Sequence, residues 1–215
     1  SFESPLASAI NYEMFDSIKS QAQNTTEQLA VERGACPDDD SCSVRNTHLL
    51  AIAPNASSSI ICGNTSPSIE PFRANAYTQK TKSGSYLQKN KFLEELLEKY
   101  EQNTESTWKS IVTNKGSVQY IDGLPDYIKE KYRTVWEIPM KHIINMSKDR
   151  GAYICQSQSL NLFVESPNFK ILSSMHFYGW KKGLKTGMYY LRTRPSSKAI
   201  QFTVEPETVC ESCSA

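Results

Sequence analysis

Long apolar runs and an excess of one charge are both missing from this sequence of 215 residues. No apolar segment approaches the roughly 20 residues that a helix needs to span a bilayer. The 24 Lys and Arg residues are balanced by 23 Asp and Glu residues, whereas a surface for nucleic acid or anionic lipid is usually marked by a strong basic excess. We therefore expect no nucleic acid and no membrane as partner.

A secretory signal is also missing. The N-terminal stretch SFESPLASAINYEMFDS has no basic segment and no long apolar core, and a signal peptide requires both. The 6 cysteines are spread over a chain that is large enough to fold without disulfide staples. We expect free thiols in a reducing compartment, which indicates a cytoplasmic protein. Because the sequence begins with Ser1 rather than Met, we also expect a processed chain or a fragment.

The motifs of several enzyme classes are absent as well. The sequence contains no glycine-rich phosphate loop, no heptad pattern and no internal repeat. Its 3 histidines, His48, His142 and His176, lie far apart in the sequence. We find no set of metal ligands at zinc spacing and no nucleophile–histidine–acid arrangement. We expect no metal site in this chain.

The sequence does contain alternating helical and extended patterns. Apolar residues at helical spacing predict helices over 9–33, 90–101, 104–113, 130–149 and 166–182. Pro139 is expected to kink the fourth of these helices. Continuous apolar runs predict buried strands at 48–53 and 159–164, and a hairpin is expected around Ser83 and Gly84. This alternation indicates an α/β fold.

A loop of small and hydroxylic residues follows the strand predicted at 48–53. After Pro54 it contains Asn55, Ala56, Ser57 and Ser58. In α/β folds, ligands bind at the carboxyl ends of the strands, and small side chains let backbone N–H groups approach an anion. The pattern is compatible with an ordinary turn, which is the commoner case, and with a phosphate-binding turn.

Aromatic and basic side chains are concentrated in the stretch MHFYGWKKGLKTGMYYLRTRP, residues 175–195. Its first half is typical of a helix end with a stop at Gly183, and its second half predicts a short strand over 186–192. Tyr189 and Tyr190 are adjacent, and neighbours in a strand point to opposite faces. The pair fits either a packed aromatic strand or two phenols that carry an oxidising equivalent.

The chain ends in a cysteine pair, Cys210 and Cys213, separated by two residues in a polar stretch. A zinc site would need a second ligand pair. Closely spaced thiols on a mobile tail can instead carry reducing equivalents by thiol–disulfide exchange. The alternative is that the two cysteines are incidental.

Several of these stretches together resemble one family, the large (catalytic) subunit of class I ribonucleotide reductase, and the resemblance is to its C-terminal part. The stretches that carry it are PNASSS and SIEP within 54–71, VWEI at 135–138, DRGAYICQSQSLN at 149–161, the block at 175–195 and the cysteine-paired tail. The resemblance implies the C-terminal part of a ten-stranded α/β barrel over residues 1–204. It also implies a mobile, redox-active tail over 205–215.

The resemblance also implies roles for particular residues. Asn55, Ala56, Ser57 and Ser58 match the turn that binds the substrate diphosphate, although the family often has Thr at the position of Asn55. Tyr190 and Tyr189 match the pair that relays an oxidising equivalent, with Tyr190 facing the small subunit and Tyr189 the active site. Cys210 and Cys213 match the pair that re-reduces the active-site disulfide. The other cysteines do not stand in the family's motifs, and we expect them to be structural.

The function that the resemblance implies is reduction of ribonucleoside diphosphates by a radical mechanism. The radical cysteine and the two cysteines that reduce the ribose belong to family segments that precede this chain. We therefore expect the chain to be incomplete alone, as a fragment or as the product of a split gene. The implied partners are the N-terminal part of the large subunit, the small subunit with its metal-radical cofactor, and thioredoxin or glutaredoxin. No cofactor is expected on this chain. The alternative is a non-catalytic remnant that binds nucleotide phosphates or the small subunit.

Overall fold

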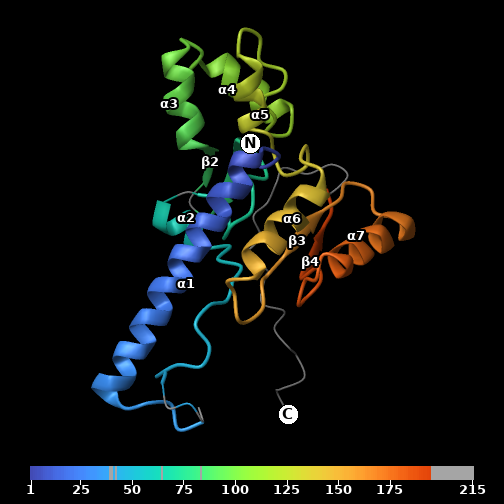
Figure 1. Cartoon of the computed structure of the whole chain (residues 1–215). Coiled ribbons are helices and arrows are strands. Elements are labelled where there is room, and N and C mark those ends of the chain that lie inside the picture. Colours follow the sequence, from blue (N-terminus) through green and yellow to red (C-terminus); the bar gives the residue numbers. More distant parts are fainter. Residues whose placement is uncertain (39–40, 42, 64, 83, 195–215) are drawn as a thin grey trace, which may run out of the picture.

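The computed structural model describes residues 1–38, 41, 43–63, 65–82 and 84–194. A long N-terminal helix lies along one side, a group of short helices forms one end, and a strand pair lies beside two further helices (Figure 1). The elements are α1 (Pro5–Arg33), α2 (Ser58–Gly63), β1 (Ala76–Thr81), β2 (Gly84–Lys89), α3 (Lys91–Lys99), α4 (Glu105–Thr113), α5 (Asp126–Lys131), α6 (Met140–Gly151), β3 (Asn161–Phe163), α7 (Phe169–Lys181) and β4 (Tyr190–Arg192).

Helix α1 confirms the predicted helix and begins four residues earlier than expected. The side chain of Ser4 caps it by accepting a hydrogen bond from the backbone N–H of Ala7 at 3.1 Å. Pro5 follows in the first turn, where proline is tolerated because the N–H group that it lacks would have no intrahelical partner. The helix ends at Arg33 because Gly34 adopts a φ of 84°, which a residue without a Cβ tolerates.

The hairpin and the three short helices after it share one core. Strands β1 and β2 pair antiparallel with Thr81 opposite Gly84, which confirms the predicted hairpin. The core consists of apolar side chains from β1, α3, α4, α5 and the loops between them: Ala76, Leu93, Leu97, Trp108, Ile111, Val118, Ile121, Leu124, Ile128 and Tyr132. At the base of this group, Gly116 lies against Ala74, and a Cβ on Gly116 would lie 2.3 Å from that of Ala74. The two segments can therefore approach this closely only with glycine at position 116.

Pro139 begins a helix instead of kinking one, so the predicted helix over 130–149 is wrong in its first half. Helix α6 starts at Met140 with Pro139 as its N-terminal cap residue, and it ends at Gly151 as expected. A proline is favoured at a helix start because the first N–H groups have no intrahelical partner. The residues before it form a turn in which Glu137 accepts hydrogen bonds from the N–H and the hydroxyl of Thr134. Val135 is fully buried in this turn, which explains its apolar character.

Strands β3 and β4 pair in parallel, with Asn161 opposite Tyr190 and Phe163 opposite Arg192. Strand β3 is buried on both faces and confirms the strand predicted over 159–164. A second core lies between β3 and α6 and is formed by Ile138, Ile143, Ile144, Leu160 and Leu162.

The buried strand predicted at 48–53 is wrong. The segment is extended but makes only one isolated bridge, between Ile52 and Gln158, and it pairs in parallel there. Ala51 and Ala53 are exposed. A strand needs a partner along its length, whereas this segment is held by a few hydrogen bonds to residues 155–159.

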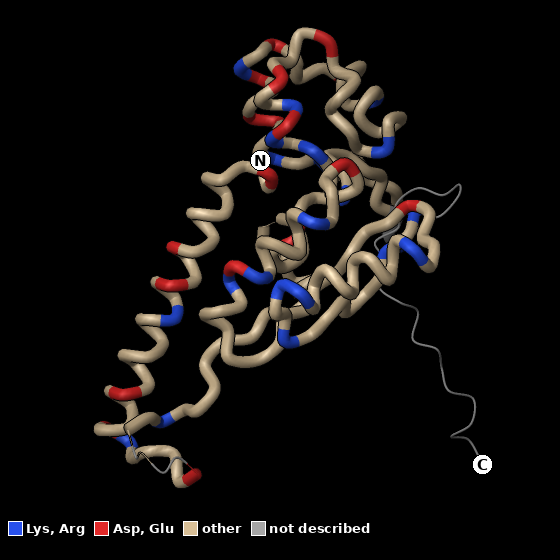
Figure 2. The backbone as a smooth tube through the Cα atoms, turned by 45° about the vertical axis from the view of Figure 1, so that its right-hand side comes forward, with Lys and Arg blue, Asp and Glu red and all other residues tan. Residues whose placement is uncertain are grey.

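Lysine and arginine are interspersed with aspartate and glutamate in the group of short helices, whereas acidic residues predominate on α1 and residues 166–194 carry only basic ones (Figure 2). Within the part of the chain that the structure describes, no helix combines the length and the apolar composition needed to cross a membrane.

Candidate functional site

Tyr189 and Tyr190 lie together at the start of β4, with their rings in contact. The ring centres are 4.4 Å apart and the ring planes are inclined by 65°. The backbone N–H of Tyr189 donates to the carbonyl oxygen of Leu160 at 2.7 Å, which fixes the pair beside β3. Both side chains are exposed, at 54% and 43%. The expectation that the two phenols point to opposite faces is wrong, because Tyr189 precedes the three-residue strand and its ring packs against that of Tyr190.

Two arginines that follow the tyrosines pack against aromatic rings. The guanidinium carbon of Arg192 lies 4.5 Å from the centre of the Tyr190 ring, and that of Arg194 lies 4.9 Å from the Trp136 ring. Arg194 also pairs with Glu165 at 2.7 Å. Such cation–π contacts favour a fixed arrangement of ring and cation. The basic residues of the LRTR segment are therefore packing partners of the aromatic groups.

A buried carboxylate lies next to this strand pair. Glu70 is 6% exposed and accepts a hydrogen bond from the side-chain amide of Asn161, the residue opposite Tyr190 in the sheet. Burial raises the pKa of Glu70, while the charges of Arg73 and Arg192 and the hydrogen bond from Asn161 lower it in part. In the sequence, the SIEP segment served only as one of the stretches that carry the family resemblance. In the structure, its Glu70 joins the loop after α2 to β3 through the hydrogen bond from Asn161.

The turn from Asn55 to Ser58 is exposed and leads directly into α2. Asn55 has a φ of 47°, and its carbonyl oxygen accepts from the N–H of Ser59 at 3.3 Å. This bond occupies the N–H of Ser59, whereas the first N–H groups of a helix generally lack intrahelical partners, which is the property that an anion site needs. The turn and the tyrosine pair occupy separate places in the structure (Figure 1). The structure therefore brings the two tyrosines together but does not bring the turn to them.

The redox pair Cys210 and Cys213 lies outside the described residues, as does the predicted tail over 205–215. Cys36, Cys62 and Cys155 are free thiols. The Sγ of Cys155 accepts from the backbone N–H groups of Leu49 and Leu50 at 3.0 and 3.2 Å. Burial raises the pKa of the Cys155 thiol, whereas these hydrogen bonds lower it. The lowering effects are larger together, so the net shift of the pKa is downward. Cys155 thus anchors the extended segment after His48.

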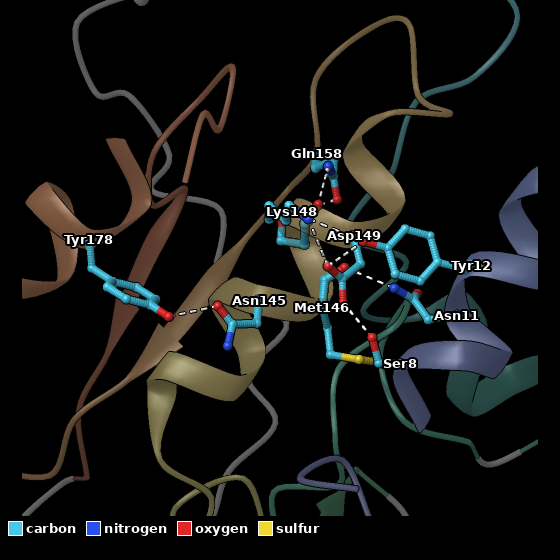
Figure 3. A network of polar contacts seen from close by, with 10 residues as sticks. Ser8, Asn11, Tyr12, Asn145, Met146, Lys148, Asp149, Gln158 and Tyr178 are labelled. Carbon is cyan, nitrogen blue, oxygen red and sulfur yellow. Dashed lines mark hydrogen bonds and ion pairs between the residues drawn. The ribbon is translucent and has the colours of Figure 1, made fainter. Parts of the chain in front are cut away.

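A polar network that the sequence did not predict joins α1 to α6 (Figure 3). Asp149 accepts from the Ser8 hydroxyl at 2.7 Å and from the Tyr12 hydroxyl at 2.9 Å, and Lys148 lies 3.4 Å from it. Burial raises the pKa of Asp149, but the hydrogen bonds from Ser8, Tyr12 and Lys148 lower it more, so the net pKa is below its ordinary value. This network orients α1 on the rest of the chain.

A second part of the network holds the turn after α6. The Gln158 side chain accepts from Arg150 Nε at 2.7 Å and from the Ser147 hydroxyl at 3.1 Å. Arg150 is 4% exposed, and burial lowers its pKa to about 10. Tyr178 on α7 donates to Asn145 on α6 at 2.8 Å (Figure 3). In the described part of the chain, no group of three or more His, Cys, Asp or Glu side chains is arranged to hold a metal ion.

Comparison with known proteins places these features in a family context. Residues 39–190 match the family described as ribonucleotide reductase, barrel domain. The chain is 51% identical over 162 residues to the ribonucleoside-diphosphate reductase large subunit of Caenorhabditis elegans, covering 75% of this chain and 20% of that protein. It is 41% identical over 243 residues to the large subunit of Danio rerio, covering 98% of this chain and 30% of that protein.

A solved structure agrees with these matches. The Actinobacillus ureae class Id ribonucleotide reductase alpha subunit superimposes with a TM-score of 0.81 at 34% identity, over 90% of this chain and 35% of that one. The chain thus spans between about a fifth and about a third of the length of these relatives.

Proposed function

Since the chain belongs to the ribonucleotide reductase large-subunit family, we propose that it works as one piece of a ribonucleoside-diphosphate reductase. Its expected role is in reducing ribonucleoside diphosphates to 2′-deoxyribonucleoside diphosphates. The family match and the structural neighbour confirm the resemblance seen in the sequence and the assignment to the barrel domain. The observation that carries the proposal is the contact of the Tyr189 and Tyr190 rings, 4.4 Å apart at their centres.

The tyrosine pair is proposed to relay a radical. Tyr190 gives one electron and its phenolic proton to the radical of the small subunit, whose metal cofactor generates it. Tyr189 then gives one electron and one proton to the Tyr190 radical. A cysteine on the rest of the large subunit gives one electron and one proton to the Tyr189 radical and becomes a thiyl radical. Ring contact supports these steps because a radical moves readily between groups at such a distance. The exposure of both phenols gives a second subunit access to them.

The turn at Asn55, Ala56, Ser57 and Ser58 is proposed to bind the substrate diphosphate. Its position before α2 presents backbone N–H groups, and its side chains are small or hydroxylic. The thiyl radical then removes the 3′ hydrogen of the bound ribose, and the 2′ hydroxyl leaves as water. Two cysteines on the rest of the large subunit supply two electrons and two protons and become a disulfide. The 3′ hydrogen then returns from the radical cysteine to the ribose, which restores the thiyl radical.

Cys210 and Cys213 are proposed to return the active-site cysteines to their reduced form after each turnover. Their thiols reduce the active-site disulfide by exchange and become a disulfide themselves, in a transfer of two electrons and two protons. Thioredoxin or glutaredoxin would reduce this second disulfide. Because these reductants act in a reducing compartment, a cytoplasmic location is proposed.

The second candidate function is a non-catalytic remnant that binds nucleotide phosphates or the small subunit. The exposed turn before α2 would be sufficient for such binding. A remnant, however, requires neither a tyrosine pair in ring contact nor a terminal cysteine pair, and this chain has both. The reductase proposal is therefore favoured.

The proposal is tested by mixing this chain with the remaining part of a large subunit and with the small subunit. Formation of deoxyribonucleoside diphosphate is measured with a dithiol reductant, and an intact large subunit is assayed in parallel. The proposal predicts product only when all three components are present. Binding of the small subunit without any product, while the intact subunit turns over, would support the remnant instead.

A further inference from the structure

Helix α1 has one face packed on the chain and one apolar face that the described residues leave uncovered. On the packed face, Phe15 and Asn11 are buried, and the Asn11 side chain donates to the Met146 carbonyl oxygen on α6 at 3.0 Å. Ser8 and Tyr12 bind Asp149 on the same side (Figure 3). Helix α6 therefore covers this face and leaves the adjoining one open.

The uncovered face carries a stripe of large apolar side chains at four-residue spacing, which we name the α1 stripe. Its members and their exposed fractions are Leu6 (68%), Ile10 (46%), Met14 (53%) and Ile18 (44%). Residues four apart lie on one side of a helix, so the stripe is continuous and about 18 Å long. Single exposed apolar residues are ordinary, but a contiguous row marks an interaction surface.

The charges of α1 argue against a lipid surface as the occupant. A helix that lies on a membrane carries lysine and arginine beside its apolar face. Acidic residues predominate on α1, and much of its length lacks basic side chains (Figure 2). The acidic residues are Glu13, Asp16, Glu27 and Glu32, and the basic ones are Lys19 and Arg33.

The fold indicates what covers the stripe. The family's domain is a barrel, and a closed barrel needs more strands than the parallel pair of β3 and β4 that the described residues supply. Helix α1 lies within the stretch aligned to the Danio rerio large subunit, of which this chain covers 30%. The other strands and their helices must come from the rest of the large subunit. In an α/β barrel the helices form a ring around the strands, so each helix has a neighbour on both sides. Among the described elements, α1 makes its main contacts with α6 alone.

We propose that the α1 stripe is the surface through which this chain binds the remaining part of the large subunit, against an apolar helix face of that part. The inference rests on the proposed function, because it takes the remaining large subunit as partner. The proposed interface lies on one face of α1 and does not include the tyrosine pair or the turn at Asn55.

The experiment measures binding, so that it can fail independently of the activity assay. The full chain is titrated with a polypeptide that comprises the rest of the large subunit, and the dissociation constant is measured by calorimetry. The double variant Ile10→Glu and Met14→Glu places two charges in the stripe. The matched control is Val31→Glu, which changes an 89% exposed residue on the same helix beyond the stripe. Circular dichroism verifies that each variant is folded.

The stripe variant is expected to bind at least about 100-fold more weakly, since it loses the burial of two large apolar side chains. The control is expected to bind within about threefold of the original chain. Equal binding by the stripe variant would overturn the assignment of the surface while leaving the proposed function intact. No binding by the unmodified chain would overturn both. Sedimentation that shows a dimer of this chain, broken by the stripe variant, would identify a second copy as the occupant and contradict the proposal.

Discussion

The guanidinium carbon of Arg192 lies 4.5 Å from the centre of the Tyr190 ring, on the same short strand. Arg192 also interacts electrostatically with Glu70, which accepts a hydrogen bond from Asn161. Asn161 is in turn opposite Tyr190 in the sheet. Tyr190 is thus linked to Glu70 in two ways: through the charge of Arg192, which lies against its ring, and through its strand partner Asn161. This arrangement holds the Tyr190 ring against that of Tyr189 without burying either one.

Replacing Arg192 tests whether this contact orders the ring. Arg192→Gln removes the cation–π contact, which contributes about 0.5–1 kcal/mol at an exposed site. With 3-fluorotyrosine at position 190, the fluorine NMR resonance is expected to broaden or to shift toward the unfolded value. Arg192→Lys keeps the charge and should have a smaller effect. Lys182→Gln, which removes a cation 5.4 Å from the Tyr178 ring, is the control. An unchanged resonance in Arg192→Gln would show that the arginine does not position the ring.

The Asp149 network predicts a pH-dependent stability. Because hydrogen bonds hold the pKa of Asp149 below its ordinary 3.8, its carboxylate stabilises the fold above that pH and loses this contribution as pH falls through the folded-state pKa. Asp149→Asn is expected to lower the free energy of unfolding by about 1–2 kcal/mol near neutral pH. The difference should shrink in acid. Urea denaturation measures both, with the exposed Asp122→Asn as control. The same loss at neutral and acid pH would mean that the carboxylate charge is not responsible.

Glu70 predicts a pH dependence of the opposite sign. Burial raises the pKa of Glu70 above 4.5, so the folded state holds the proton more tightly than the unfolded state does. Stability therefore falls as pH rises from about 4.5 through the folded-state pKa. Glu70→Gln keeps an oxygen for Asn161 without the charge and should raise the melting temperature at neutral pH but not below pH 4.5. The exposed Glu130→Gln should change little. A lower melting temperature for Glu70→Gln at neutral pH would show that its ion pair with Arg73 outweighs burial.

The helices could be predicted from the sequence because their signals are local. Asn90, Thr104 and Asn168 each cap a helix with a side-chain hydrogen bond to its first turn, and the apolar spacing within the helices matches the buried side. Gly183, with a φ of 75°, follows α7 where the sequence predicts its end. Such signals need no knowledge of the rest of the fold.

The failed predictions depend on distant contacts. The segment at 48–53 has strand composition, but in the described part of the chain it forms only one isolated bridge, between Ile52 and Gln158, and its other hydrogen bonds go to the turn around Cys155. Pro139 was expected to kink a helix, but the buried Val135 donates its backbone N–H to the carbonyl oxygen of Phe72, 63 residues earlier in the sequence. This contact belongs to a turn before Pro139, and the helix starts after that proline.

The site was predictable only in part, and for the same reason. Tyr189 and Tyr190 stand out as residues, but their ring contact follows from the point at which β4 begins. Glu70 and Asn161 are 91 residues apart in sequence, so no local pattern links them. The cysteine pair at 210 and 213 was identified from spacing and resemblance alone, and its role stays a prediction.

The role of that pair is tested with Cys213→Ser. In the reconstituted enzyme, the variant is expected to lose most of its turnover when thioredoxin is the reductant, because the tail can no longer form a disulfide. Small dithiols reach the active site directly and should sustain turnover. Cys62→Ser, which removes an exposed thiol, serves as the control. Equal loss with both reductants would argue against a shuttle tail.

The radical relay is the central claim, and the most direct test is the turnover of Tyr190→Phe in the enzyme reconstituted with the rest of the large subunit and the small subunit. Phenylalanine keeps the ring that packs against Tyr189 and Arg192 but has no phenolic hydrogen to give. The account predicts that product formation falls to background while small-subunit binding and the circular dichroism spectrum stay unchanged. Tyr86→Phe, at a tyrosine 49% exposed on β2, should keep full turnover. Undiminished turnover of Tyr190→Phe would contradict the account.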